Sequence, residues 1–356
     1  MLCLNVSSVI RAQHNGISLV TARNYYMRET KSDLLLFGGI PGLRDSVMIR
    51  YGPGKQVLHK KAVFKQDSSA IVSIPISHLG VGIYKIRLVG EDIDTLETEL
   101  VKLRPVSNSV QIERRRGGLV KRRLPYFSAG FYCYWPLQPN LAEEERVRGF
   151  TMISPYQRIE EETRPERRRY MDRCAQLSMN VNYNLCSVAG GGGVARSRQR
   201  GLSEEEKLDL LREEVIAFRD HPALLSWYIA DEPYGNNADP EKLARAYRII
   251  KQLDPYHPVT MVFMAPSRAE AFRNSFDIAM TDPYPIPHGS VEEAGDAVET
   301  LHNLFYPEKP VWIVPQAFGG NEQWKREPTG RELRVMTWLA VLRGASGLQY
   351  FIRQRP

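Results

Sequence analysis

The sequence lacks any long apolar run. Across its 356 residues, no stretch approaches the ~20 consecutive apolar residues that cross a membrane, so we expect no membrane-spanning helix. The N-terminus has only a short, interrupted apolar run without a convincing cleavage site, so no signal peptide is visible. We therefore expect a cytoplasmic protein, or an extracellular or periplasmic one if the true N-terminus is missing from this sequence.

Cysteine is scarce, and its spacing excludes the common zinc motifs. The four cysteines form no CxxC or Cys/His pattern, so we expect free, buried thiols and no zinc site. The run Gly190–Gly193 follows a predicted strand but lacks the GxxxxGK-S/T pattern of a phosphate-binding loop. We interpret it as a flexible active-site loop. Nothing in the sequence indicates a metal or an organic cofactor.

The sequence also lacks the concentrated positive charge of a nucleic-acid-binding protein. Its net charge is +7 and its pI about 9.1, which is only mildly basic. Arginines do cluster, but glutamates are interleaved with them or close by, which favours solvated or ion-paired loops over a nucleic-acid surface. The clusters are Arg114–Arg116, Arg122–Arg123, Arg164–Arg169 and Arg196–Arg200.

Short runs of alternating apolar and polar residues fill positions 1–104, separated by Gly- and Pro-containing turns. This pattern predicts an antiparallel, immunoglobulin-like β-sandwich with an accessory role. The polar, basic segment 105–117, which begins at Pro105 and ends at the first residue of Gly117-Gly118, is the predicted linker. Examples of the predicted strands are Asp33–Phe37, Ser46–Tyr51, Ala70–Ile76, Ile83–Val89 and Leu96–Leu103.

From residue 118 to 356 the pattern changes to alternating strands and helices, which predicts a parallel sheet with crossover helices. Eight strands and seven intervening helical stretches predict a (β/α)8 TIM barrel. Its last helix is lacking, so we interpret the barrel as truncated at the C-terminus. The predicted strands are Ser128–Trp135, Phe150–Tyr156, Val181–Val188, Leu224–Asp231, Val259–Met264, Phe276–Thr281, Val311–Val314 and Gly347–Ile352.

Two adjacent acids stand where the fourth predicted strand ends. The run LLSWYIADEPY, Leu224–Tyr234, leads from apolar residues into Asp231 and Glu232 and is stopped by Pro233. In a TIM barrel the C-terminal strand ends carry the chemistry. Adjacent strand residues normally point to opposite faces, so both acids share a site only if the strand ends or bulges there.

Four segments in this order resemble the TIM-barrel glycoside hydrolases, specifically the clan of retaining β-galactosidases, β-glucuronidases and cellulases. Many members carry a β-sandwich before the barrel. The resemblance implies hydrolysis of an oligo- or polysaccharide, with Glu232 as general acid/base. The segments are HPALLSWYIADEP (His221–Pro233), DPYP (Asp282–Pro285), KPVWIVPQAF (Lys309–Phe318) and RGASGLQYF (Arg343–Phe351).

Two positions depart from that clan. Asp231 stands where Asn usually precedes the strand-four Glu, and Gln316 stands where the clan has its nucleophilic Glu. An amide cannot act as a carboxylate nucleophile, so the identity of the second catalytic group stays open. The candidates are Asp282 as base or electrostatic partner, Asp231 acting with a substrate acetamido group as in barrel N-acetylhexosaminidases, and Glu322 from its loop. Gln316 also motivates an alternative, a non-catalytic carbohydrate-binding protein on a degenerate glycosidase barrel.

Aromatic and amide side chains cluster at the predicted strand ends. Aromatic rings stack on the C–H faces of sugars, and amides hydrogen-bond to hydroxyl groups, so the set predicts a carbohydrate cleft. We interpret His288 as a rim residue and expect no nucleic-acid partner. The predicted substrate contacts are Tyr132, Tyr134, Tyr156, Gln157, Asn184, Tyr284, Gln316 and Tyr350.

Overall fold

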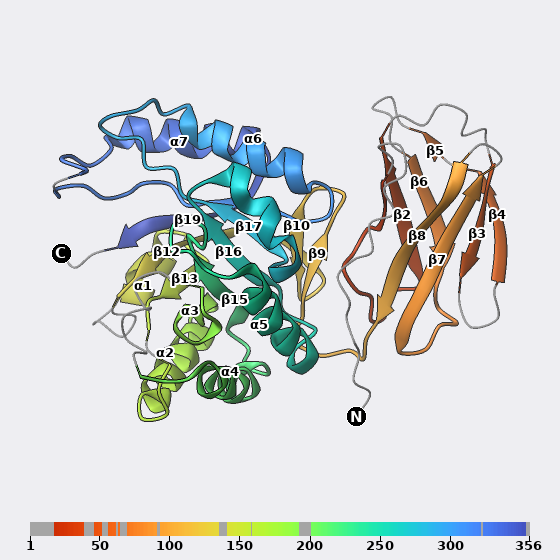
Figure 1. Cartoon of the computed structure of the whole chain (residues 1–356), viewed down its shortest axis with the longest axis horizontal. Coiled ribbons are helices and arrows are strands. Elements are labelled where there is room, and N and C mark those ends of the chain that lie inside the picture. Colours follow the sequence, from red (N-terminus) through yellow and green to blue (C-terminus); the bar gives the residue numbers. More distant parts are fainter. Residues whose placement is uncertain are drawn as a thin grey trace. The chain divides into compact units, whose positions relative to one another are not determined.

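A computed structural model describes most of the chain and divides it into two compact units (Figure 1). The first unit contains residues up to Val106 together with Gln111–Arg116, and the second contains Ser107–Val110 and the chain from Gly117 onward. The accessory role predicted for the first unit stays a prediction. The described residues are 18–38, 46–51, 56–61, 63–64, 70–90, 93–134, 141–157, 159–191, 201–321 and 323–353.

The first unit contains two four-stranded antiparallel sheets, with strand orders β1-β2-β6-β5 and β4-β3-β7-β8. Alternate side chains of both sheets, such as Leu34, Val72, Ile86 and Leu96, are buried in one apolar cluster. The predicted β-rich unit is therefore present, while its immunoglobulin-like classification stays a prediction. The strands are β1 (Ser18–Thr21), β2 (Lys31–Phe37), β3 (Ser46–Tyr51), β4 (Gln56–Lys61), β5 (Val63–Phe64), β6 (Ala70–Pro75), β7 (Gly82–Gly90) and β8 (Ile93–Lys102).

A short hairpin precedes the barrel. After β9 (Val110–Glu113), strands β10 (Gly118–Lys121) and β11 (Leu124–Tyr126) pair antiparallel across a turn in which Arg122 and Arg123 have positive φ. The buried Lys121 ammonium group donates hydrogen bonds to Asn180 and, at 3.1 Å, to the Leu224 carbonyl. Both acceptors lie at the first residue of a barrel strand, so the hairpin is fixed at the end of the barrel opposite the predicted site.

Eight parallel strands then close into a barrel in the order β12 to β19, with β19 paired to β12, which confirms the predicted TIM barrel. The strands are β12 (Ser128–Cys133), β13 (Met152–Pro155), β14 (Asn180–Asn184), β15 (Leu224–Asp231), β16 (Val259–Phe263), β17 (Ile278–Thr281), β18 (Val311–Ile313) and β19 (Ala345–Arg353). The helices are α1 (Leu141–Val147), α2 (Arg164–Gln176), α3 (Cys186–Ala189), α4 (Glu204–Phe218), α5 (Pro240–Leu253), the 3₁₀ helix η2 (Pro266–Ser275), α6 (Glu293–Phe305) and α7 (Gly330–Leu342).

Local capping explains where several helices begin. Ser203 and Glu206 form a capping box at the start of α4, and Asp239 caps α5 ahead of Pro240. One strand prediction is wrong at its end. Strand β14 stops at Asn184, and residues from Cys186 form the short helix α3, because the Asn184 side chain accepts a hydrogen bond from the Cys186 amide and turns the chain.

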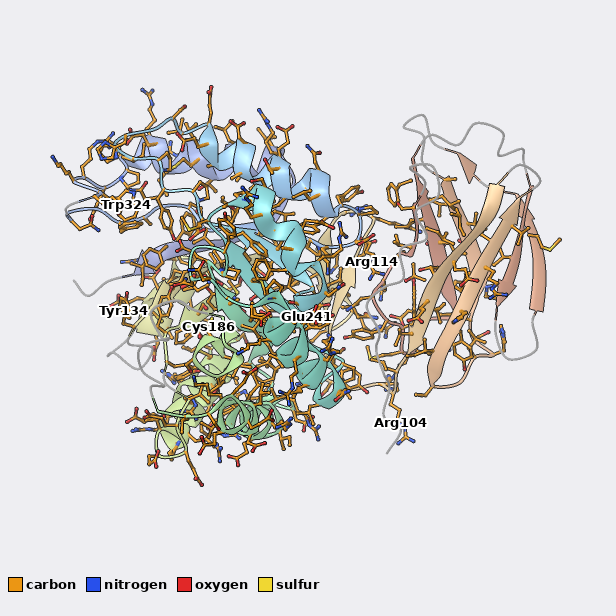
Figure 2. The ribbon with its side chains drawn as sticks, viewed as in Figure 1. Arg104, Arg114, Tyr134, Cys186, Glu241 and Trp324 are labelled. Atoms are coloured by element: carbon orange, nitrogen blue, oxygen red, sulfur yellow. The ribbon has the colours of Figure 1, made fainter. Side chains whose placement is uncertain are left out.

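The barrel interior contains a polar layer beneath the strand ends. The Asn182 amide donates to Gln349 Oε1 at 3.0 Å and accepts from the hydroxyls of Ser226 and Thr260 at 2.8 and 3.1 Å. These four side chains are fully buried. Outside the strands, apolar residues such as Trp227 pack against the helices, and side chains fill the layer between them (Figure 2).

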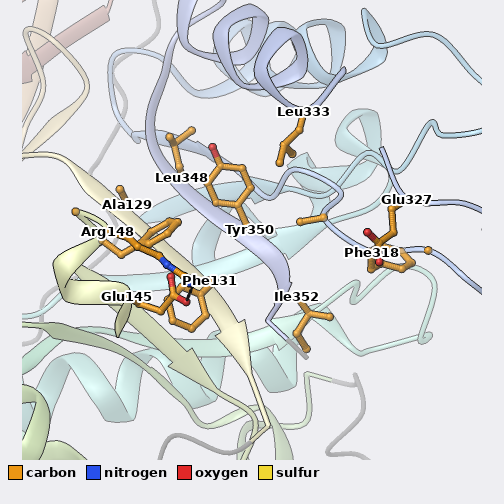
Figure 3. A pocket seen from close by; sticks show the side chains of 14 residues that line it. Ala129, Phe131, Glu145, Arg148, Phe318, Glu327, Leu333, Leu348, Tyr350 and Ile352 are labelled. Atoms are coloured by element: carbon orange, nitrogen blue, oxygen red, sulfur yellow. Dashed lines mark hydrogen bonds and ion pairs between the residues drawn. The ribbon is translucent and has the colours of Figure 1, made fainter. Parts of the chain in front are cut away.

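An uncovered groove runs along β19 and β12, between α7 and α1. It has a volume of about 690 Å³, and the described part of the chain contains no helix after β19 that would cover it (Figure 3). Its lining is mixed: it combines apolar side chains such as Phe131, Leu333 and Leu348 with the charged Arg148 and Glu327. Among the described residues, no helix combines the length and the apolar character that a membrane crossing requires.

Candidate active site

Glu232 follows β15 in a backbone conformation that is uncommon for a residue with a side chain. Its φ is 50°, in the left-handed region. The Glu232 amide donates to the Val262 carbonyl at 3.1 Å, and the Asn236 side-chain amide donates to the carbonyls of Asp231 and Glu232 at 3.0 and 3.1 Å. These bonds hold the turn that carries both acids, and strained positions of this kind occur preferentially at functional sites.

The strand is also irregular just before the acids. Its register against β16 shifts between Tyr228 and Ala230, an irregularity that breaks the strict alternation of side chains just before the two acids. Gly191 lies against this segment, and its carbonyl accepts from the Asp231 amide at 3.1 Å. A Cβ atom at Gly191 would stand 2.0 Å from the Ile229 carbonyl oxygen, so only glycine fits there. Gly191, within the predicted loop, is therefore packed against β15, while residues 192–200 lie outside the described part of the chain.

Asp282 faces these two acids from the end of β17. Burial raises its pKa well above the ordinary value, and the neighbouring charges of Glu232 and Asp231 raise it further. The side chain is buried, and its Oδ1 atom has no hydrogen-bond partner among the described residues. The barrel therefore brings all three predicted catalytic carboxyl groups within electrostatic reach of one another.

Asp231 is held by tyrosines. Burial raises its pKa to about 6, the Glu232 charge adds to this, and the Tyr228 and Tyr156 hydroxyls oppose it. Tyr156 donates to Asp231 Oδ2 at 3.2 Å. The Tyr228 hydroxyl is near enough to act on the Asp231 pKa, yet it makes no hydrogen bond of standard geometry. The Tyr132 hydroxyl and Asn184 Nδ2 are also buried without a partner in the described structure. Such atoms are costly in a folded protein unless a ligand or water uses them.

A continuous aromatic wall lines this end of the barrel. Tyr156 stacks on Tyr132 and Tyr134 with ring centroids 5.2 and 5.4 Å apart, and Tyr132 meets Phe351 at 5.6 Å. Phe351 in turn stacks on Tyr284 at 5.7 Å, and Tyr284 contacts Trp324 at 5.9 Å. Flat apolar faces beside carboxyl groups suit a sugar ring. The labelled Tyr134 and Trp324 mark the two ends of the wall (Figure 2).

Tyr350 does not join this wall. Its hydroxyl forms a hydrogen bond with the Thr337 hydroxyl on α7 at 3.0 Å, and its ring lines the groove on the outside of the barrel. The next residue, Phe351, takes the inward position that the sequence analysis assigned to Tyr350. The alternation along β19, with Gln349 buried inside the barrel, is the signal that could have identified Phe351.

Gln316 is used by the protein itself. Its Oε1 accepts from the Ile286 amide at 2.9 Å, and its Nε2 donates to the carbonyls of Ile286 and Phe318 at 2.8 and 3.2 Å. The side chain is fully buried and fixes the loop after β17. Both amide hydrogens are therefore occupied, and contact with a substrate stays a prediction.

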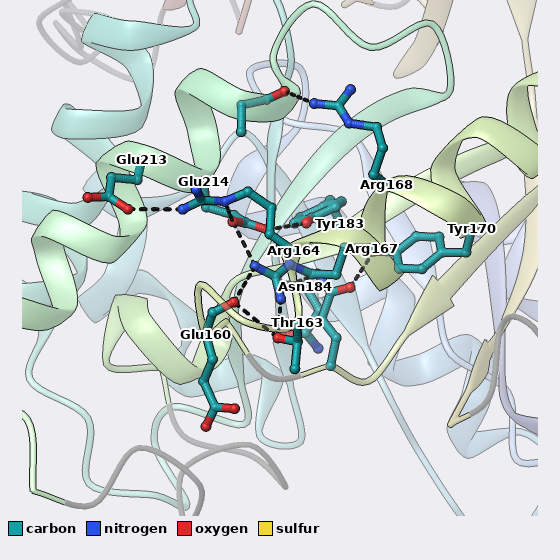
Figure 4. Close-up of polar contacts among 12 residues, drawn as sticks. Glu160, Thr163, Arg164, Arg167, Arg168, Tyr170, Tyr183, Asn184, Glu213 and Glu214 are labelled. Carbon is teal, nitrogen blue, oxygen red and sulfur yellow. Dashed lines mark hydrogen bonds and ion pairs between the residues drawn. The ribbon is translucent and has the colours of Figure 1, made fainter.

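Gln157 belongs to a buried network behind the site. It donates to the Asn184 carbonyl at 2.9 Å and accepts from the Tyr170 hydroxyl. Tyr170 lies on helix α2, and so does the buried Arg167. Arg167 pairs with both carboxylate oxygens of Glu214 on α4, which is fully buried and also accepts a hydrogen bond from Tyr183 (Figure 4). This part of the arginine cluster is ion-paired, but on a helix and with a glutamate 47 residues along the chain, not in a loop beside the neighbouring glutamates.

The remaining candidates are at the rim or outside the described residues. His288 is at an exposed site and contacts the Gln323 carbonyl at 3.0 Å, which agrees with its interpretation as a rim residue. Glu322 and Trp135 lie outside the described part of the chain. Within that part, no group of three or more His, Cys, Asp or Glu side chains is arranged to hold a metal ion.

Comparison with known proteins identifies the class of fold. No family model matches the chain, and no curated protein matches it. Solved structures of glycoside hydrolases do match it over nearly its whole length. The chain therefore has the fold of the TIM-barrel glycoside hydrolases, as predicted.

Three of the matching structures are β-glucuronidases. One is an FMN-binding enzyme from Facaelibacterium prausnitzii L2-6, with a TM-score of 0.52 and 13% identity over 95% of this chain and 55% of that one. A calcium-binding mutant of Bacteroides uniformis β-glucuronidase 2 has a TM-score of 0.50 and 14% identity, over 94% of this chain and 46% of that one. The Dictyoglomus thermophilum enzyme has a TM-score of 0.49 and 14% identity, over 96% of this chain and 63% of that one. The chain spans less than two thirds of each, and at these identities the likeness concerns the fold alone.

Proposed function

We propose that the protein hydrolyses glycosidic bonds of an oligo- or polysaccharide, with Glu232 as general acid/base and Asp282 as the second carboxyl group. The observation that carries the proposal is the interaction between these two carboxyl groups at the C-terminal ends of β15 and β17. Burial and the neighbouring charges of Glu232 and Asp231 raise the pKa of Asp282, so Asp282 keeps its proton to a higher pH than an isolated carboxylic acid does.

The two carboxyl groups differ in exposure, and this sets their roles. Asp282 is 6% exposed, whereas Glu232 is only partly buried and can reach a glycosidic oxygen in the cleft. Glu232 therefore delivers the proton to the leaving oxygen and takes it from Asp282, which is left as the carboxylate. Asp282 acts at the anomeric carbon in one of three ways. It stabilises the developing positive charge electrostatically, attacks the carbon as a nucleophile, or activates a water molecule as a general base. Gln316 takes no covalent part, because an amide is no carboxylate nucleophile.

Substitution of Glu232 by Gln tests the proton transfer. We expect kcat on a 4-nitrophenyl glycoside to fall about 10²–10⁴-fold, the usual contribution of a general acid. The loss should shrink with a 2,4-dinitrophenyl leaving group, which departs without protonation. Glu241→Gln, an exposed carboxylate on α5, is the matched control and should leave the rate unchanged. An equal loss on both substrates would argue against Glu232 as the acid.

Two rival functions follow from particular observations. The bond from Tyr156 to Asp231 would suit an N-acetylhexosaminidase-like mechanism, in which Asp231 orients a substrate acetamido group. This mechanism predicts that the protein hydrolyses N-acetylhexosaminides but not glycosides that lack the acetamido group. The occupied Gln316 amide would suit a non-catalytic carbohydrate-binding protein, which predicts glycan binding without turnover and without any effect of Glu232→Gln on affinity.

A further inference from the structure

We propose that Tyr234, Met264 and Arg268 form a rim platform that binds the leaving group of the substrate and favours an acidic ring there, either a hexuronic acid or an aromatic acid. The inference rests on the proposed function, because a leaving group exists only where a glycosidic bond is broken. It deepens that function, because it assigns the part of the substrate that receives the proton from Glu232.

Met264 lies at the barrel mouth, directly after β16. Along this strand the Thr260 hydroxyl bonds inside the barrel, whereas the Phe263 ring points outward and meets Phe272 of η2 with ring centroids 6.1 Å apart. Continued alternation places the Met264 side chain on the inner side. The register of β16 against β17 puts Met264 level with Asp282, and Met264 is 54% exposed. An apolar side chain is therefore presented at the mouth, beside the acids.

Tyr234 reaches the same rim from the turn that carries the acids. It is 51% exposed and follows Glu232 by two residues, so the two Cα atoms lie at most about 7 Å apart. The next residue, Gly235, packs against Met264, because a Cβ atom there would stand 2.7 Å from the Met264 sulfur. The tyrosine ring and the thioether are therefore neighbours close to the proton donor. Both groups pack well against the faces of sugars and aromatic rings.

Arg268, near the start of η2, adds a positive charge to the rim platform. Its guanidinium carbon lies 5.3 Å from the centroid of the Tyr234 ring, and the residue is exposed. A guanidinium group that stacks on a ring keeps N–H donors at its edge, where they match the two oxygens of a carboxylate. The rim platform therefore combines apolar surfaces for a ring with donors for an acid group on that ring.

The position of the rim platform matches the place of the leaving group. Glu232 must touch the glycosidic oxygen to protonate it, and the leaving ring begins at that oxygen. Strand β16, which ends at the platform, lies between β15 with Glu232 and β17 with Asp282. Much of the aromatic wall stands on β12, β13 and β19, across the barrel from β16. The wall therefore suits the sugar that loses its leaving group, and the platform suits the leaving group itself.

Substitution of Tyr234 by Ala tests the binding of the leaving ring. The substrates are the 4-nitrophenyl glycoside that the unmodified protein hydrolyses fastest and the glycosyl fluoride of the same sugar, which has no ring to leave. We expect Tyr234→Ala to raise KM for the aryl glycoside about three- to tenfold with kcat nearly unchanged, because the ring is bound equally before and in the transition state. Hydrolysis of the fluoride should not change. Trp338→Ala, an exposed ring on α7, is the matched control and should affect neither substrate.

Two leaving groups that share a ring but differ in charge test the role of Arg268. They are 4-carboxyphenyl and its methyl ester, on the same sugar, and each variant is compared with the unmodified protein on the same substrate. We expect Arg268→Gln to lower kcat/KM about five- to tenfold for the carboxyphenyl glycoside and less than about twofold for the ester. Arg268→Lys should restore part of the loss because it keeps the charge. Arg331→Gln, an exposed position of α7, should change neither rate.

A disaccharide whose leaving sugar is a hexuronic acid, compared with its carboxyl-reduced form, identifies the source of the acid. Sensitivity of this pair to Arg268→Gln would indicate a uronic acid, and sensitivity of the aryl pair alone would indicate an aromatic acid. Equal effects of Tyr234→Ala on the fluoride and the aryl glycoside would overturn the inference, because the residue would then act on the Glu232 turn. Unchanged kinetics in Tyr234→Ala and Arg268→Gln would overturn it and leave the proposed function standing, whereas absence of all glycoside hydrolysis by the unmodified protein would reject both.

Discussion

At the scale of single residues, Asp282 and Asp277 respond to pH in opposite directions although both are largely buried. Burial raises the pKa of Asp282, and Glu232 and Asp231 raise it further. Burial acts on Asp277 in the same sense, but the ammonium groups of Lys251 and Lys309 outweigh it and lower its pKa below the ordinary 3.8. The two residues therefore predict opposite contributions to stability.

The sign of each contribution follows from which state binds more protons. Above pH ~4 the folded protein retains a proton on Asp282 that the unfolded chain has lost, so this residue lowers stability as pH rises. Asp277 stabilises the fold above its ordinary pKa, and this contribution is lost as pH falls through its lowered pKa. We expect Asp282→Asn to raise the free energy of unfolding by about 1–3 kcal/mol at pH 7.5 and by little at pH 4. Asp277→Asn should lower it at pH 7.5, with a smaller effect below pH 4.

Urea unfolding of the unmodified protein and both variants between pH 4 and 8 measures these changes. If Asp282→Asn destabilised the protein at pH 7.5, the assignment of a buried, proton-retaining acid at this position would be wrong. The comparison with Asp277→Asn controls for the general effect of exchanging a buried carboxyl group for an amide.

At the scale of secondary-structure elements, the ion pair between Arg167 and Glu214 joins α2 to α4 behind the site. Both side chains are buried, and Tyr183 of β14 also donates to Glu214. Removal of Glu214 leaves the Arg167 charge buried and uncompensated, which typically costs about 3–5 kcal/mol. Removal of Arg167 costs less, because Glu214 keeps a second partner, Arg164 at 3.4 Å. The pair fixes α2, whose Tyr170 holds Gln157, and therefore supports the loop after β13.

We expect Glu214→Gln to lower the free energy of unfolding by about 3–5 kcal/mol, Arg167→Met to lower it by less, and the double variant to cost less than their sum. Denaturant titrations measure this. Asp209→Asn on the exposed face of α4, where Asp209 pairs with Arg212, is the control and should change stability by less than about 0.5 kcal/mol. Additive costs would indicate that the pair is not energetically coupled.

At the scale of the whole molecule, the groove along β19 and β12 lies on a face of the barrel that no helix of the described residues covers. Seven strand-to-strand connections carry helices, and in the described part of the chain this face carries none. On α7, Trp338 and Leu342 are also exposed, at 60% and 78%. Apolar surfaces of this extent bind other apolar groups.

We expect the dye 8-anilinonaphthalene-1-sulfonate to bind the folded protein with a strong rise in fluorescence, because the groove offers apolar walls. Ala317→Trp, which adds a ring inside the groove, should reduce the rise several-fold. Arg331→Trp adds the same ring at an exposed position of α7 and should not reduce it. Unchanged dye binding in Ala317→Trp would place the dye elsewhere on the protein.

The sequence by itself determined the order of the barrel strands, the capping of α4 and α5, and the position of Asp231 and Glu232 at a strand end. These features depend on local patterns, namely apolar runs, capping residues and a proline stop, so neighbouring residues suffice to predict them. Only the tertiary structure decided that Asp282 faces Glu232 and that Phe351, not Tyr350, lines the site. It also decided that the Gln316 amide hydrogen-bonds to the loop after β17. Those features depend on strand register, on a bulge and on one residue with positive φ, which are set when distant strands close into a barrel.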